Sequence, residues 1–141
     1  MTPQAIAQTV ADYLSGQTYP VTHSVSRRYL PLRKAVSKTN VEVFIAPVSF
    51  GFQPLNRFEQ NYERSFSIGI IQKAHYDDLG SYDDAEMDKF VQLVERVAYD
   101  AANTPTLHFL SVDPSDYFDN YELEAGYFTA SINIQFRQLG E

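Results

Sequence analysis

The stretch that decides the fold is "GYFTASINIQFRQLGE", residues 126–141, because its residue types alternate almost without fault. One parity is apolar, with Phe128, Ala130, Ile132, Ile134 and Phe136. The other parity is polar, with Thr129, Ser131, Asn133, Gln135 and Arg137. Successive side chains leave opposite faces of a strand, so the pattern predicts a half-buried strand. It is longer than the usual strand of about 5–6 residues, and its polar face meets either water or another protein.

Two amphipathic helices supply surfaces that could cover the apolar face of this strand. In "TPQAIAQTVADYLSG", residues 2–16, Thr2 suits the N-cap and Pro3 the first helical position. The stretch "DDAEMDKFVQLVERVAYDAAN", residues 83–103, has apolar residues at helical spacing. The predicted buried stripe of this second helix is Met87, Phe90, Val91, Val94, Val97, Ala98 and Ala101.

Four further segments have the composition of strands. They are residues 19–31, 40–50, 61–74 and 106–114. Because proline cannot donate to a ladder, we expect pairing to end at Pro47 or to lie there at a sheet edge. Residues 49–60 are expected to form a loop. The order of helix, three strands, helix and two strands predicts one α+β domain spanning residues 1–141, with a mainly antiparallel sheet and its two main helices on one face.

Composition narrows the classes of function. The 141 residues carry a net charge of −7 and include no cysteine. Disulfides, cysteine zinc sites and thiol nucleophiles are therefore excluded, and counterion-driven binding of nucleic acid is disfavoured. No apolar run reaches the roughly 18 residues of a membrane-spanning helix, so we expect no membrane partner.

Catalytic motifs are missing from the sequence. There is no GxSxG elbow, no phosphate-binding GxxxxGK[ST] loop and no HExxH. The different-class alternative is a small metal-dependent hydrolase. Its candidate ligands are His75, Asp77, Asp78 and His108. Because their spacing matches no known ligand motif, we expect neither enzyme activity nor a cofactor.

Charge is distributed unevenly along the chain. Residues 27–38 include the bases Arg27, Arg28, Arg33 and Lys34 and no acid. Residues 77–88 are acidic, and a second acidic block contains Asp113, Asp116, Asp119, Glu122 and Glu124. These blocks are either solvated faces that favour solubility, or complementary surfaces for head-to-tail assembly of subunits. A DNA-facing basic patch is the third alternative, and the acidic balance of the chain opposes it.

The layout as a whole resembles a known family. An N-terminal helix "AIAQTVADYL" precedes "RRYLPL" and "VEVFIAP", and an aromatic loop leads into "RSFSIGI". The helix "MDKFVQLVERV" and the final "FTASINIQFRQL" complete the order. Nearly the whole chain is in this way similar to the tail terminator proteins of long-tailed bacteriophages, also called tail completion or head–tail joining proteins.

The resemblance implies a structural role in the virion tail or neck, after assembly in the host cytoplasm. Such proteins form a hexameric ring on the tail tube, stop its polymerisation and present a surface to the head-completion or stopper protein of the neck. DNA is then only cargo that passes through the lumen. The aromatic residues Phe50, Phe52 and Phe58 either pack onto the protein's own core or contact the tube or a neighbouring subunit. The polar face of residues 129–137 becomes a candidate lumen lining or interface. Another neck component, or a minor tail protein, is the alternative within the same class.

Overall fold

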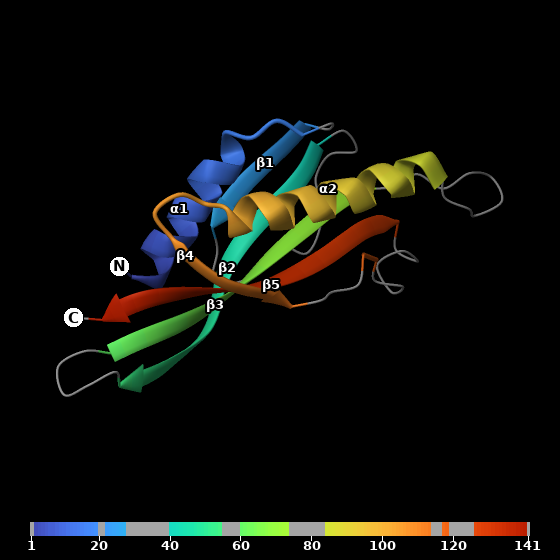
Figure 1. Cartoon of the computed structure of the whole chain (residues 1–141). Coiled ribbons are helices and arrows are strands. Elements are labelled where there is room, and N and C mark those ends of the chain that lie inside the picture. The colour runs from blue at the N-terminus through green and yellow to red at the C-terminus, as the bar shows by residue number, and fades with distance from the viewer. Residues whose placement is uncertain are drawn as a thin grey trace.

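The computed structural model describes residues 2–19, 22–27, 40–54, 60–73, 84–113, 117–118 and 126–140. Along the chain these form α1 (Pro3–Ser15), β1 (Thr22–Arg27), β2 (Asn40–Pro54), β3 (Gln60–Lys73), α2 (Asp84–Ala102), β4 (His108–Asp113) and β5 (Tyr127–Gly140). Figure 1 shows both helices on one face of a twisted sheet. The predicted α+β class, with a mainly antiparallel sheet and its helices on one face, is confirmed.

The five described strands lie in the order β1-β2-β3-β5-β4. Strand β1 is parallel to β2, whereas the other three neighbouring pairs are antiparallel. The long β5 pairs with β3 along its whole length, from Tyr127 opposite Lys73 to Gly140 opposite Gln60. Strand β5 therefore lies inside the described sheet, between β3 and the edge strand β4.

The N-cap, the first-turn proline and the C-terminal end of α1 lie where the sequence predicts them. Thr2 is the N-cap, where its Oγ1 accepts a hydrogen bond from the backbone N–H of Ala5 at 3.1 Å. Pro3 occupies the first helical position, where its missing N–H removes no helical hydrogen bond. The helix ends before Gly16.

The hydrophobic core fills the space between the helices and the sheet. The predicted apolar parity of β5 is buried, and the ring of Phe128 lies 5.5 Å from that of Phe90 on α2. Helix α1 contributes Ile6, Val10 and Leu14, all at most 2% exposed. Burying each such side chain contributes about 1.5–3 kcal/mol, so packing of these faces dominates the stability of the fold.

The prediction for the segment after Pro47 was wrong in part. Pairing of β2 with β1 ends at Ile45, but pairing with β3 continues to Pro54. A β-bulge between Pro47 and Ser49 shifts the register there, and the bulged residue Val48 is 61% exposed. The bulge accommodates proline in a long strand, because the strand is at the edge of the described sheet beyond Ile45.

Two of the predicted loop aromatics consequently lie in a strand. Phe50 is opposite Arg64 and Phe52 is opposite Tyr62 in the β2–β3 ladder. In Figure 1 this end of β2, β3 and β5 extends beyond both helices. The third aromatic, Phe58, lies outside the described residues.

Candidate interaction surface

The polar parity of β5 lies on the sheet face opposite the helices. Of its five predicted residues, Ser131, Asn133 and Arg137 are exposed, and Thr129 and Gln135 are half-buried. Figure 1 places α1 and α2 on the other side of the sheet, and no other described helix exists to cover this one. We call this surface, centred on residues 129–137, the open face.

Neighbouring strands extend the open face with short uncharged side chains. The register sets Ser67 opposite Asn133, and Ser65 and Ser111 on either side of Gln135. The hydroxyls of Ser67 and Ser131 lie 3.2 Å apart. The Ser111 hydroxyl donates to Oε1 of Gln135 at 3.3 Å. The centre of the open face is thus a layer of hydroxyls and amides that can exchange hydrogen bonds with water or with a protein surface.

One end of the same sheet face is apolar and closely packed. Phe44 and Ile71 are each 4% exposed, and Tyr127 packs against them. The Phe44 ring lies directly over Gly69, where an added Cβ would be 2.1 Å from the ring Cζ. The sequence therefore needs glycine at position 69, because any side chain there would displace the ring. Packing within this cluster holds together β2, β3 and β5, and β3 and β5 carry the polar centre of the open face.

A buried polar pair joins the segment between α1 and β1 to α2. The Tyr19 hydroxyl donates to Oδ2 of Asp100 at 2.8 Å, and both residues are less than 10% exposed. Burial, followed by this hydrogen bond, raises the pKa of Tyr19 far above its ordinary value. Nε of Arg96 lies 3.7 Å from the same Oδ2. The pair has a structural explanation, since each buried polar group satisfies the other.

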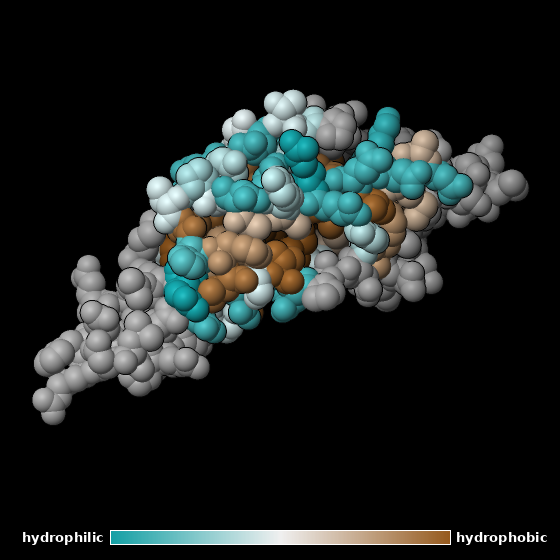
Figure 2. Space-filling model, viewed as in Figure 1, coloured by the Kyte–Doolittle hydropathy of each residue, from teal (hydrophilic) through white to brown (hydrophobic). Residues whose placement is uncertain are grey.

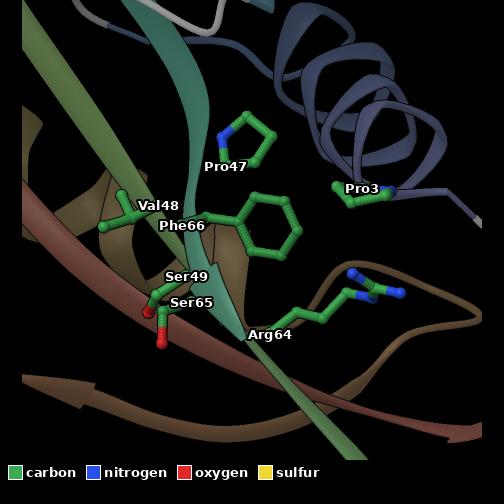
Figure 3. A pocket seen from close by; sticks show the side chains of 7 residues that line it. All are labelled: Pro3, Pro47, Val48, Ser49, Arg64, Ser65 and Phe66. Carbon is green, nitrogen blue, oxygen red and sulfur yellow. The ribbon is translucent and has the colours of Figure 1, made fainter. Parts of the chain in front are cut away.

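A pocket of about 240 Å³ lies where α1 begins, beside the β-bulge. Figure 3 shows Phe66 and Arg64 extending from β3 toward Pro3, with Pro47 above them. Its walls are two prolines, an aromatic ring and the exposed Val48, with Arg64 as the charged group. Ser49 and Ser65 complete the lining, and no histidine or carboxylate is among the lining residues to act as a base for their hydroxyls.

The structure describes only some of the residues predicted to form interfaces. Asp113 ends β4, where it is exposed and opposite Asn133, so it borders the open face. Arg27 ends β1, opposite Ile45. The remaining candidates lie outside the described residues and stay predictions: Arg28, Arg33, Lys34, Asp116, Asp119, Glu122 and Glu124.

Only one of the four alternative metal ligands, His108, lies in the described part of the chain. His108 is exposed at the start of β4, opposite Arg137, and a neighbouring cation opposes metal binding. His75, Asp77 and Asp78 lie outside the described residues. Within those residues there is no group of three or more His, Cys, Asp or Glu side chains that could hold a metal ion.

Sequence patterns did not indicate the exposure of Phe109, one of several exposed aromatic side chains of the described residues. Phe109 on β4 is 38% exposed, although it is a large apolar residue in a strand. Tyr99 on α2 is 65% exposed, and Tyr117 is 42% exposed with its hydroxyl on Oε1 of Glu95 at 2.7 Å. No local signal distinguishes Phe109 from a core residue of a strand, because its exposure depends on which elements pack beside it. Tyr99, in contrast, lies outside the buried stripe predicted for the second helix.

Comparison with known proteins does not assign the chain to a family. No protein-family model matches the chain, and a search of curated proteins finds no related sequence. None of the described helices is long and apolar enough to cross a membrane. Function therefore has to be argued from the open face and the fold.

Proposed function

We propose that this protein is a tail terminator of a long-tailed bacteriophage. In this role it forms a hexameric ring that caps the tail tube, ends its polymerisation and provides the joint to the head and neck. The ring belongs to the virion, with the tail tube protein on one side and a head-completion or stopper protein on the other. DNA passes through the lumen as cargo.

The observation that carries the proposal is the open face. One face of the sheet is covered by two helices, while the centre of the other presents the uncharged Ser67, Ser131 and Asn133, with the charged Arg137 and Asp113 toward its border. A surface of this kind suits either a hydrated interface between subunits or a lumen wall along which DNA slides. An interface between subunits that forms only on the tail tube needs weak attraction between free subunits. A lumen wall needs weak attraction for DNA, so that the passing DNA is not retained.

Two further properties support the same role. The order of elements confirmed in the structure is the order on which the family resemblance rests. The net charge of −7 favours solubility of the protein before it meets the tail. The three-stranded end of β2, β3 and β5, which extends beyond the helices, offers a backbone platform for the tube or a neighbouring subunit.

The rival assignments are other neck components and minor tail proteins. Binding to purified tails, compared with binding to DNA-filled heads, separates them. We expect the purified protein to sediment with tails lacking it and to be visible as a ring at one tail end by electron microscopy. Binding to filled heads but not to tails would instead assign a head-completion or stopper role.

A further inference from the structure

Strand β4 differs from the three central strands of the sheet, β2, β3 and β5, in having no buried residue. Its six positions, His108–Asp113, are all exposed or half-buried. Strands β2, β3 and β5 each contain several side chains that are at most 1–2% exposed. Nevertheless, half of β4 is apolar, with Phe109, Leu110 and Val112. In Figure 2 hydrophobic surface is visible below the polar ridge of α2, in the region where Figure 1 draws β4.

The outer side of β4 is also an open ladder within the described residues. It pairs with β5 on one side and is the last strand in the sheet order. An exposed apolar edge strand is a template for pairing with another strand. Proteins usually block such edges with lysine, proline or a covering element, and β4 contains neither lysine nor proline.

The occupant that fits this edge is β4 of a second copy. Antiparallel self-pairing centred between Leu110 and Ser111 sets His108 opposite Asp113 of the second copy, twice by symmetry. The same register sets Phe109 opposite Val112 of the second copy. The first pair joins a base or hydrogen-bond donor with an acid, and the second joins two apolar side chains. Both combinations stabilise antiparallel ladders.

The two residues of each pair also lie on the same face of the sheet. His108 and Asp113 are opposite Arg137 and Asn133, so both are on the open face. Phe109 and Val112 are opposite Phe136 and Ile134, whose side chains are buried on the helix side. Residues three apart would normally lie on opposite faces, but the register shift between Phe109 and Ser111 brings Phe109 and Val112 to the same one.

We infer that the free protein forms a two-fold dimer by pairing of β4 with β4 of a second copy. Such a contact is isologous and closed, so it stops at two subunits and cannot itself build a ring. It covers the apolar edge while the subunit is in solution. The inference does not depend on the proposed tail function, since it concerns the purified protein alone.

The test is size-exclusion chromatography with light scattering, together with amide hydrogen exchange of residues 108–113. We expect a dimer whose β4 amides lose protection on dilution. His108→Glu, which faces Asp113 of the second copy, should weaken the dimer roughly twofold to thirtyfold, because like charges meet at two places. His108→Glu/Asp113→Lys should restore it. The matched control is Gln92→Glu on the exposed side of α2, which adds the same charge and should change nothing.

Phe109→Lys should convert the protein to a monomer, with circular dichroism to show that it remains folded. A wild type that is monomeric at high concentration would overturn the inference. So would a dimer, or any larger assembly, that His108→Glu leaves unchanged or that the double variant fails to restore.

Discussion

The hydroxyl of Tyr19 donates a hydrogen bond to Oδ2 of Asp100 at 2.8 Å, although the two residues are 81 positions apart in the chain. The bond joins the segment between α1 and β1 to the last turns of α2. It is buried, so neither group can exchange its partner for water. The energetic importance of the pair follows from that burial rather than from the bond itself.

Tyr19→Phe should lower the free energy of unfolding by about 1–3 kcal/mol, because the Asp100 carboxyl loses its buried donor. Urea denaturation measures the change. The matched control is Tyr117→Phe, which removes a tyrosine–carboxylate hydrogen bond of similar length to the exposed Glu95. Water replaces that donor, so the control should change stability by less than about 0.5 kcal/mol. Equal effects of the two variants would contradict the structural role given to Tyr19.

The same pair predicts a dependence of stability on alkaline pH. Burial and the Asp100 hydrogen bond raise the pKa of Tyr19 above that of the unfolded chain. Above a pH of about 10 the unfolded chain releases the Tyr19 proton while the folded protein retains it, so stability falls with rising pH. Tyr19→Phe lacks this contribution. Its denaturation midpoint should therefore fall less steeply above pH 10 than that of the wild type, and parallel curves would contradict the prediction.

Gly69→Ala should destabilise the fold by about 1–3 kcal/mol, because its Cβ would overlap the Phe44 ring. Thermal or urea unfolding measures the loss, and Gly69→Ala/Phe44→Leu should recover part of it. Gly16→Ala is the control. Its Cβ would be 3.6 Å from the nearest atom, and φ of −83° suits any residue. That variant should be neutral or up to about 1 kcal/mol more stable, since alanine restricts the unfolded chain.

The open face can be tested without disturbing the core. Ser131→Glu places a charge in its uncharged centre, on a side chain that is already exposed. We expect folding stability to stay within about 0.5 kcal/mol and binding to purified tails to fall at least about tenfold, since a charge buried at an interface costs more than that. Gln92→Glu on α2 adds the same charge away from the open face and should bind normally. Unchanged tail binding by Ser131→Glu would remove the open face from the contact.

Charge complementarity between subunits gives a separate prediction. Replacing Arg27 and Arg28 by Glu reverses part of the basic segment that has no acid between residues 27 and 38. Subunit association on tails should weaken while the fold survives, and the difference from wild type should shrink as salt rises, because screening acts within about 10 Å at 0.1 M. Assembly that is equally strong at low and high salt would argue against head-to-tail charge pairing.

Local patterns predicted much of this fold. Alternation in residues 127–138 was enough to predict β5, and the cap at Thr2 with the apolar stripe of α1 was enough to predict that helix. The parallel pairing of β1 with β2 could not be predicted, because a strand pattern does not identify its neighbour. Pro47 left two outcomes open, an end of pairing or a sheet edge, and the structure shows the edge: β2 continues past Pro47 paired with β3, while its pairing with β1 has already ended at Ile45.

The candidate site was predictable only in part. The polar parity of β5 could be predicted from the sequence. Its exposure could not, because it depends on both helices packing on the opposite face of the sheet. The buried Asp100 was not expected, because the other acids on α2 are exposed or half-buried. Its burial is explained by its hydrogen bond with Tyr19, which is far away in sequence. The apolar edge of β4 was hidden similarly, since its composition is that of an ordinary core strand.

The most direct measurement is the length and head-joining of phage tails assembled without this protein, viewed by electron microscopy. The tail terminator assignment predicts tubes of unregulated length that fail to join heads, and recovery of normal tails, each with a hexameric ring at the tube end, when the protein is restored. Tails of regulated length that lack the protein and still join heads would contradict the assignment.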